Sequence, residues 1–505
     1  MGLIEIDTFI EGAKNVFLIG NLLWLCIGVI WGVIAGAIPG ITSAMAMIIV
    51  LPLSYTLSPM ESMILMCSCY AGSIYGGSIT SILLNAPGNP GSACTALDGY
   101  PLSKKGFSNE ALGLAVSASA LGGLFSYFVL LFGMNIVSRF ALRFGPPELF
   151  MVTIVGISVI ASTQGKSVVK GLLSGFLGLF LGTVGMATTG GIRGTFLNPN
   201  LMEGLPFLPV LIGFFAFNEA IYLTQRPYVY SILTGKKRQI FSLKRFYEGM
   251  LIVFKYPINV IRSSIIGTII GAIPATGADL ASFIAYNQAQ QFSSHPETFG
   301  KGEYEGITAS ETSNNASTGG AILTTLTLGI PGSTSTAVLL GALMLQGLIP
   351  GPRLFMEQMP LVYTIIVSLF LSQLVMIIVG TGSSYLFTLV VSFPTKILAP
   401  IIGFMCVLGA YAVRNSVFDI YIMLIASVIG ILMRSYGYPL IGFVVGLVLG
   451  PIADEQFILT YIVYKGNFTV FFTRPLSLCI FIIVVITLLL PFYISKKKDR
   501  VRKDT

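Results

Sequence analysis

The chain has 505 residues, of which 54% are hydrophobic and only 10% charged, and its formal net charge is +8. This composition leaves too few polar side chains to cover a water-soluble protein, which excludes soluble fold classes and predicts the lipid bilayer as solvent. The basic residues gather in segments 226–255 and 496–503, a positive-inside pattern that argues against nucleic-acid binding and places both segments in the cytoplasm.

Apolar segments recur along the whole chain. In the first half they lie near 17–38, 43–57, 61–84, 111–137, 148–163, 167–187 and 204–224. In the second half they lie near 257–274, 278–290, 306–330, 335–349, 361–380, 383–410, 417–433, 437–450 and 476–495. The last segment shows no alternation of polar and apolar residues, so helices are expected rather than barrel strands. Because a spanning helix needs about 20 apolar residues, we predict an all-α, polytopic transmembrane helix bundle of roughly 10 to 14 spans.

Two pairs of matching motifs divide the chain into similar halves. Gly32–Gly40 (GVIAGAIPG) and Gly267–Ala275 (GTIIGAIPA) share six of nine residues at an offset of 235. The second match, at an offset of 243 to 244, pairs a Gly-Gly step with a later Pro-Gly step: Gly76–Gly77 with Pro87–Gly88, and Gly319–Gly320 with Pro331–Gly332.

One structural unit used twice accounts for both matches, and Gly/Pro-interrupted segments at matching places point to broken helices and a binding site. The alternative is that small residues recur in any membrane bundle because they let helices approach closely. We predict a first transmembrane repeat over 1–225, a basic cytoplasmic connector over 226–255, a second repeat over 256–495 and a basic cytoplasmic tail over 496–505. Whether the repeats are inverted or parallel stays open.

The first half is least helix-like over Tyr75–Pro101, because Pro removes a backbone donor and Gly permits left-handed backbone. Non-helical backbone at membrane depth is tolerated where it lines a cavity or is buried in protein. The predicted substrate-binding residues of this half are Pro39, Gly40, Ser43, Asn85, Pro87, Gly88 and Asn89.

The second half has a counterpart in Glu311–Thr336, which is rich in amides and hydroxyls. Helix starts freed by such breaks suit carboxylates, and Ser, Thr and Asn add neutral hydrogen bonds. The alternative is simple capping of a helix hairpin. The predicted substrate-binding residues of this half are Pro274, Asn314, Asn315, Thr318, Pro331, Gly332, Ser333 and Thr334.

Four acidic residues lie beside apolar segments: Asp98, Glu219, Asp279 and Glu311. An ionisable group inside a membrane is costly and usually functional. Asp279 and Glu311 are therefore candidates to bind Na⁺ or relay a proton during ion coupling, and the alternative is that they cap helix N-termini.

Nothing in the sequence indicates an enzyme. The chain has no nucleophile–base arrangement, phosphate-binding loop or HExxH motif, and the lone His295 lies in a hydrophilic stretch. The six cysteines fall mostly in apolar segments and lack the spacing of a metal site or a disulfide framework. We therefore expect no catalytic residues, no metal and no cofactor.

The residues at the breaks resemble a known family. GAIPGITSAMAM (36–47), the segment 75–106 and the region 271–355, with GAIPATGADLASFIAYN, TSNNASTGGA and LGIPGS, closely resemble the large membrane subunit of the tripartite tricarboxylate transporters. The resemblance runs from about residue 15 to 490. Two departures are Ala275-Thr276, where the family more often has Gly-Ala, and Ser310, where it often has Pro.

The resemblance implies the permease subunit of a binding-protein-dependent secondary transporter in the cell (inner) membrane. It implies a small integral membrane subunit and an extracytoplasmic solute-binding protein as partners, citrate or other small carboxylates as substrates, and an ion gradient of Na⁺ or H⁺ as the driving force. The alternative is a stand-alone ion-coupled organic-anion carrier or exporter without a binding protein.

Overall fold

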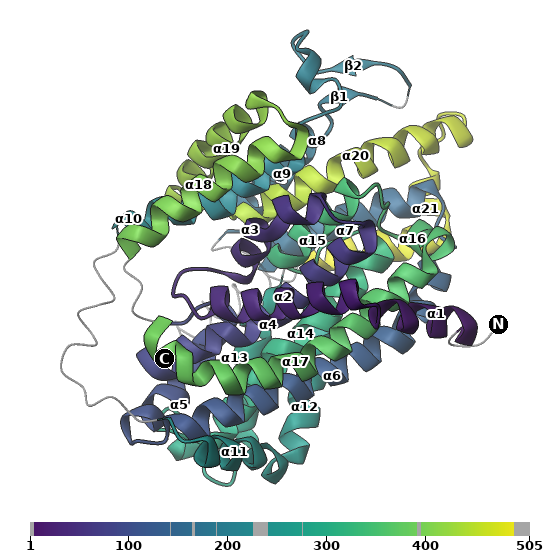
Figure 1. Ribbon diagram of the computed structural model, residues 1–505. Helices are drawn as coiled ribbons and strands as arrows, with labels where there is room; N and C mark the ends of the chain where they lie inside the picture. Colours follow the sequence, from purple (N-terminus) through teal and green to yellow (C-terminus); the bar gives the residue numbers. More distant parts are fainter. Residues whose placement is uncertain are drawn as a thin grey trace, which may run out of the picture. The chain divides into compact units, whose positions relative to one another are not determined.

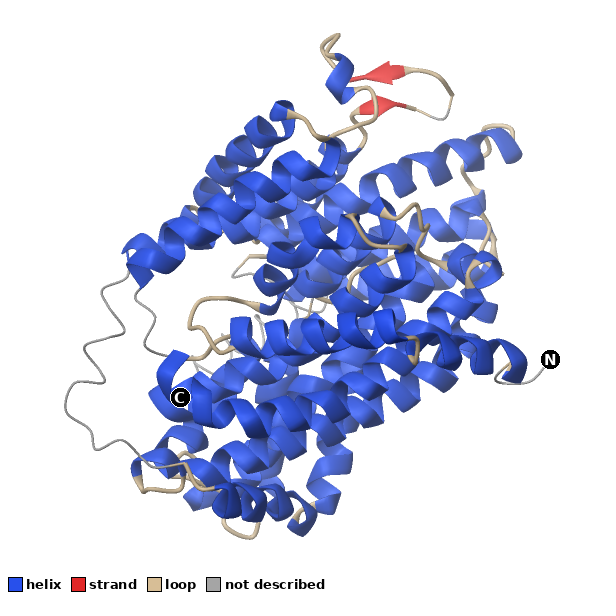
Figure 2. Cartoon of the chain, in the orientation of Figure 1, coloured by secondary structure: helices blue, strands red, loops and turns tan. Residues whose placement is uncertain are grey.

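The structure, a computed structural model, describes residues 5–488 except 142, 164–166, 188, 226–240, 275 and 391–394. Most of the predicted basic connector and the whole predicted tail, 496–505, lie outside the described residues, as does Ala275. Helices make up nearly all of what is described, and Figure 2 shows the two short strands in red.

The first half contains α1 (Ile6–Val16), α2 (Ile19–Gly36), α3 (Ser43–Tyr55), α4 (Pro59–Leu84), η1 (Pro90–Ser92), α5 (Ala93–Lys104), α6 (Ser108–Ala141), α7 (Pro146–Thr163), α8 (Val168–Gly182), β1 (Gly185–Met186), β2 (Ile192–Arg193), η2 (Pro199–Leu201), α9 (Phe207–Leu211), the π-helix η3 (Ile212–Phe217) and α10 (Asn218–Gln225). The strands β1 and β2 pair antiparallel, with Gly185 opposite Arg193.

The second half contains α11 (Leu243–Ile252), η5 (Val253–Lys255), α12 (Pro257–Ala272), α13 (Gly277–Phe292), η6 (Pro296–Thr298), α14 (Tyr304–Leu328), α15 (Thr334–Leu345), α16 (Pro352–Glu357), α17 (Met359–Val390), α18 (Thr395–Arg414), α19 (Val417–Ser435), α20 (Leu440–Val463) and α21 (Val470–Thr473). A further apolar helix covers Pro475–Leu488. Figure 1 labels most of these elements.

Among the described residues, six helices are long and apolar enough to cross a membrane: Ile19–Gly36, Ser108–Met134, Phe207–Thr224, Met359–Ser383, Val417–Ser435 and Leu440–Val463. The pair Leu243–Lys255 and Pro257–Ala272, bent by 81°, adds a seventh if it forms one span. The chain is thus a multi-pass helical membrane protein. This number is below the predicted 10 to 14 because six further apolar helices have only 10–17 residues, and because α4 and α14 are long but rich in polar residues. The total number of spans stays a prediction.

Two compact units divide the chain. Unit 1 comprises Met1–Ser138 and Phe215–Asn415, and unit 2 comprises Arg139–Phe214 and Ser416–Thr505. Each predicted repeat therefore contributes helices to both units: the first gives residues 139–214 to unit 2 and the rest to unit 1, and the second gives its residues up to 415 to unit 1 and the later ones to unit 2. The repeat boundaries themselves stay a prediction.

Unit 1 is built around two closely packed helix pairs, α2 with α4 and α12 with α14. Glycines make the close approach possible, as is usual between membrane helices. Gly36 of α2 lies directly against the carbonyl oxygen of Ser73, and Gly271 of α12 lies directly against that of Ser317. A side chain at either glycine would force the helices apart.

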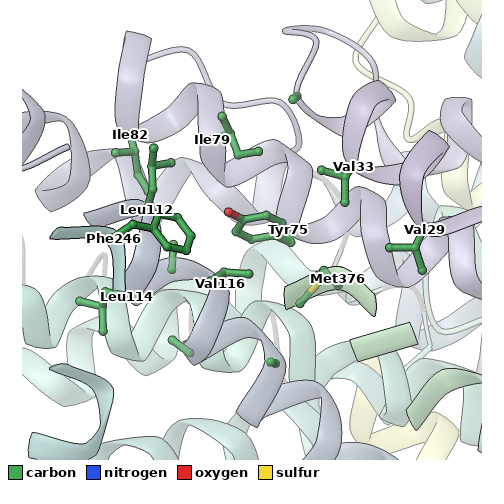
Figure 3. Close-up of a cluster of buried hydrophobic side chains, with 14 of the residues drawn as sticks. Val29, Val33, Tyr75, Ile79, Ile82, Leu112, Leu114, Val116, Phe246 and Met376 are labelled. Atoms are coloured by element: carbon green, nitrogen blue, oxygen red, sulfur yellow. The ribbon is translucent and has the colours of Figure 1, made fainter. Parts of the chain in front are cut away.

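A hydrophobic cluster fills the space beside the first pair. Figure 3 shows Val33 of α2, Tyr75 of α4, Val116 of α6, Phe246 of α11 and Met376 of α17 among its members, all fully buried. The cluster joins helices from both halves of the sequence into one core. Burial of its apolar side chains is the main term that stabilises this packed interior.

The described part of the predicted connector is not a simple loop. Its last residues form α11 and η5, and α11 packs on α6 through an ion pair between Arg245 Nε and Glu110 Oε1 at 2.6 Å. Gly249 of α11 lies against the backbone of Glu110. The sequence did not predict this helix because it is short and half polar.

Unit 2 has its own close contacts. Gly178 of α8 lies directly against the carbonyl oxygen of Phe443 in α20, and Gly446 against that of Gly175. Glu148 is fully buried and pairs with Arg474 Nε at 2.7 Å. This ion pair joins α7 to the segment before the last helix.

Candidate functional site

Helix α14 carries a row of polar side chains through the interior of unit 1. Glu311, Asn314, Asn315 and Thr318 have no exposed surface, and their spacing of i, i+3, i+4 and i+7 places them on one helix face. The sequence suggested that they lie in a broken segment. The structure instead places them in the middle of a 25-residue helix, and the break follows Leu328.

The amide groups of Asn314 and Asn315 are the least satisfied polar groups in this row. Both the nitrogen and the oxygen of each side chain are buried and have no hydrogen-bond partner among the described residues. Buried polar groups are nearly always paired, and each unpaired one costs roughly 1–3 kcal/mol. Two adjacent residues with four such atoms are therefore the strongest indication of a place where a polar ligand binds.

The first break meets this row. Helix α4 ends at Leu84, and Asn85 follows in the left-handed conformation with φ of 58°. Gly91, in η1, lies so close to α14 that a side chain there would collide with the amide oxygen of Asn314 and would come within 3.0 Å of Ala278 Cβ in α13. The first break thus contacts both α14 and the start of α13.

The second break meets α4. Helix α14 ends before Gly329, which has φ of 70°, and Ser333 precedes the first residue of α15. The hydroxyl groups of Tyr70 in α4 and Ser333 lie 3.3 Å apart. Asp279, in the first turn of α13, is near enough to interact electrostatically with Tyr70. Each break therefore touches the long buried helix of the other half.

Both breaks restart as helices with the same type of cap. Asn89 Oδ1 accepts a hydrogen bond from Ser92 N at 2.9 Å, and Ser333 Oγ accepts one from Thr336 N at 3.2 Å. The two capping boxes lie 244 positions apart in the chain. Helix N-termini carry partial positive charge, so the one beside Asn314, where Gly91 lies against the amide oxygen, suits an anionic ligand.

Other predicted residues of the first break lie at its edges or support it. Asn85 and Pro87 are exposed. The Asn89 amide donates to the carbonyl oxygen of Ile74 at 3.0 Å, which fastens the break to α4. Gly88 lies directly against the carbonyl oxygen of Gly36.

The remaining predicted residues lie in the loops between helices and at the helix starts. Pro39 and Gly40, with φ of 93° at Gly40, lie between α2 and α3, and Pro274 lies between α12 and α13. Ser43 begins α3, and its buried hydroxyl has no partner among the described residues. Pro331 and Gly332 precede α15, and Thr334 is its first residue.

Glu311 is surrounded by hydroxyl groups. Ser78 Oγ donates to Oε1 at 2.6 Å, Ser119 Oγ donates to Oε2 at 2.8 Å, and Thr95 Oγ1 donates to Oε1. The described residues include no salt bridge to Glu311. The sequence singled out Glu311 but none of its three partners, because Ser and Thr are common in membrane helices and no spacing relates 78, 95 and 119 to 311.

Asp98 has a different environment from Glu311. Its Oδ1 accepts hydrogen bonds from Gly302 N and Glu303 N, both at 2.8 Å, and its Oδ2 accepts one from the Tyr286 hydroxyl at 2.8 Å. These contacts fasten α5 to the loop before α14. His295 is exposed, with its Nδ1 3.8 Å from Glu297.

Unit 2 contains a cavity with a different character. It has a volume of about 410 Å³ and is lined by Leu173, Ser174, Leu177, Ile429, Leu432, Met433, Tyr436 and Tyr438. An almost wholly apolar lining lacks the donors that a carboxylate requires. The polar row of α14 remains the better candidate for an anion site.

Comparison with known proteins places the chain in a family. Residues 22–445 match the family described as "Tripartite tricarboxylate transporter TctA family". No solved structure matches the chain.

Two proteins of Agrobacterium vitis are similar to the chain. The "Uncharacterized 52.8 kDa protein in TAR-I ttuC' 3'region" is 33% identical over 485 residues, which cover 95% of this chain and 95% of that protein. The "Uncharacterized protein in TAR-II ttuC' 3'region" is 32% identical over 238 residues, which cover 46% of this chain and 98% of that protein.

Proposed function

The chain belongs to the tripartite tricarboxylate transporter TctA family, and from this premise we propose that it is the permease subunit of a binding-protein-dependent secondary transporter. The proposed substrates are tricarboxylates or related small organic carboxylates, imported across the cell inner membrane and driven by an ion gradient. The proposed partners are a small integral membrane subunit and an extracytoplasmic solute-binding protein. We propose a cytoplasmic C-terminus from the basic tail.

The unpaired amides of Asn314 and Asn315 carry this proposal. Four buried amide atoms without partners lie beside the first break, whose Gly91 touches Asn314. Carboxylate oxygens accept hydrogen bonds from amide N–H groups, hydroxyls and helix N-termini. All the donors that the structure brings together here are neutral, so a carboxylate would be held by directed hydrogen bonds and could leave again.

Complete burial of these amides supports alternating access. A substrate reaches Asn314 and Asn315 only when neighbouring helices part. We propose that the two halves, 1–225 and 256–495, are structural repeats that move around this site, with the breaks of both repeats facing it.

Matching contacts in the two halves support the repeat proposal. Gly36 meets Ser73 as Gly271 meets Ser317, at offsets of 235 and 244 residues. The left-handed residue that ends each long buried helix, Asn85 or Gly329, is also displaced by 244. Recurrence of small residues alone would not keep these contacts in register.

The test is uptake of a panel of radiolabelled carboxylates into membrane vesicles that contain this chain, with and without the small subunit and the binding protein. Gradient-driven accumulation that requires both partners is the expected result. Accumulation by the chain alone would favour the stand-alone carrier, and no uptake of any carboxylate would contradict the proposed substrate class.

Two variants connect the uptake assay to the site. Asn314→Ala and Asn315→Ala should each reduce uptake about tenfold or more, because a lost hydrogen bond to a charged group is worth roughly 1.5–3 kcal/mol. Their thermal unfolding should not worsen, since each change removes buried groups without partners. Normal uptake in both variants would remove this pair from the site.

A further inference from the structure

Glu311 ties helix α14 to three helices of the first half. Ser78 belongs to α4, Thr95 to the first turn of α5 and Ser119 to α6, and each donates a hydrogen bond to the carboxyl group of Glu311. The carboxyl group is fully buried. Its state of charge therefore affects four helices at once.

The donors around Glu311 are of a kind that tolerates both charge states. A hydroxyl group rotates and can donate to a carboxylate or accept from a carboxylic acid. Asp98 shows the contrast, because Gly302 N and Glu303 N donate to it and a backbone N–H cannot accept. Of the donors to Asp98, only the Tyr286 hydroxyl can also accept, so its surroundings favour the carboxylate, whereas all three hydroxyl donors to Glu311 suit a carboxyl group that gains and loses a proton.

The charged and titratable groups nearby do not neutralise Glu311. On α5, Cys94 interacts electrostatically with Glu311. Asp98, also on α5, accepts a hydrogen bond from the hydroxyl group of Tyr286 in α13. On α12, Arg262 lies over the ring of Phe292, 4.9 Å from its centre. On α6, Glu110 forms an ion pair with Arg245. The Tyr127 hydroxyl, also on α6, accepts a hydrogen bond from Thr318. On α4, Tyr75 lies one turn before Ser78.

The oxygen atoms around Glu311 are spaced as hydrogen-bond partners. A hard cation of the size of Ca²⁺ or Na⁺ separates its oxygen ligands, holding each at about 2.3–2.6 Å. Here the hydroxyl oxygens of Ser78 and Ser119 lie 2.6 and 2.8 Å from the carboxylate oxygens themselves. These distances are those of direct hydrogen bonds, the arrangement expected for a carboxyl group that exchanges a proton with its hydroxyl partners in place.

We propose that Glu311 is the proton-binding site of this transporter. It takes one proton from water on one side of the membrane to become a neutral acid, and it releases the same proton to water on the other side. On uptake an O–H bond of hydronium breaks as the carboxyl O–H bond forms, and on release the carboxyl O–H bond breaks as hydronium forms again. This inference rests on the proposed function in one respect, namely that the substrate is a carboxylate anion.

Electrostatics then fixes the direction of coupling. Asn315 is four residues from Glu311, so the two lie about 6 Å apart along the helix axis. A substrate anion at Asn315 is repelled by ionised Glu311 but not by the neutral acid, an effect on the order of tenfold to hundredfold in affinity. Proton and substrate therefore bind together, which is the requirement for symport.

The first experiment measures protonation directly, without substrate. Infrared difference spectra of the purified chain between high and low pH should contain the carbonyl band of a buried carboxylic acid. Glu311→Gln should remove this band and Asp98→Asn should leave it. Ser119→Ala, which removes one donor to the ionised form, should move the midpoint of the band to higher pH.

The second experiment measures coupling. Glu311→Gln should lose proton-driven accumulation of carboxylate at least tenfold while it retains exchange of labelled for unlabelled substrate, which needs no net proton movement. The exposed Glu357→Gln is the matched control and should accumulate substrate normally.

The outcomes separate this inference from the proposed function. A carbonyl band that persists in Glu311→Gln, a midpoint unmoved by Ser119→Ala, or undiminished accumulation in Glu311→Gln would overturn the proton site while leaving a carboxylate permease in place. A band that depends on Glu311 in a chain that moves no carboxylate would overturn the proposed function alone.

Discussion

The hydroxyl group of Tyr70, in the long buried helix of the first half, lies 3.3 Å from that of Ser333, which caps the helix after the second break. The reverse contact exists as well, because Gly91 after the first break touches Asn314 in the long buried helix of the second half. Positions 70 and 314 differ by 244, the same offset as positions 89 and 333. Crossed contacts of this kind place each break against the long buried helix of the other half.

Tyr70→Phe tests whether the Tyr70–Ser333 contact matters for transport. The variant keeps the buried ring and removes one hydroxyl, so the protein should fold normally. One neutral hydrogen bond is worth about 0.5–1.5 kcal/mol, and we expect a two- to tenfold loss of uptake with half-saturation at higher substrate concentration. The control is Val29→Ala, which trims a buried side chain of α2 beside α4 and removes no hydroxyl group. Uptake by Tyr70→Phe that matches the unchanged chain would make the contact purely structural.

Asn85 allows a sharp test because its backbone explains its identity. It is exposed and left-handed, with φ of 58° at the end of α4, a conformation that Gly and Asn adopt most readily. If capping is its role, Asn85→Gly should keep both thermal stability and uptake, whereas the β-branched Asn85→Val should lose about 1–2 kcal/mol of stability. Loss of uptake in a stable Asn85→Gly variant would instead support substrate binding, as the sequence predicted.

Hydropathy predicted the order of the helices well, because a membrane helix must be long and apolar. It missed α1 and α5, which are short or half polar, and it divided α17 near residue 381, where Gly380 and Gly382 lie within a continuous helix. Glycine is tolerated there because packing against neighbours, rather than helix propensity, stabilises such helices. The π-helix at Ile212–Phe217 has no sequence signal that we can identify.

The site was only partly predictable. Asn314, Asn315 and Glu311 stand out because amides and carboxyls are rare in apolar segments, and the structure places all three on one buried face of α14. Tyr70 and Ser119 were not predicted, since their importance lies in contacts with residues about 190 to 260 positions away. Such contacts depend on how helices cross, which composition and spacing do not determine.

Gly267→Leu tests the close packing of α12 on α14. A Cβ atom at Gly267 would come within 2.8 Å of Ala316 Cβ and 2.9 Å of Ser313 Cα, so the helices would have to separate. Overpacking of this kind costs about 1–3 kcal/mol or more, and we expect a clear fall in the yield of folded, monodisperse protein on size-exclusion chromatography. Gly191→Ala is the control, because nothing lies within 4 Å of the added atom. Equal yields from the two variants would contradict the packing of this helix pair.

Glu148→Ala tests the buried ion pair of unit 2. Glu148 is fully buried; its Oε1 lies 2.7 Å from Arg474 Nε, and its Oε2 accepts a hydrogen bond from Gly145 N at 2.8 Å. Removing one partner of such a pair leaves the other charge poorly compensated, at a cost of roughly 3–5 kcal/mol. Faster hydrogen exchange should appear in α7 and around Arg474. The control is Arg353→Ala, which breaks the exposed pair Arg353–Glu357 and should lower stability by at most about 0.5 kcal/mol. A comparable loss of stability in both variants would mean that burial does not strengthen the Glu148–Arg474 pair.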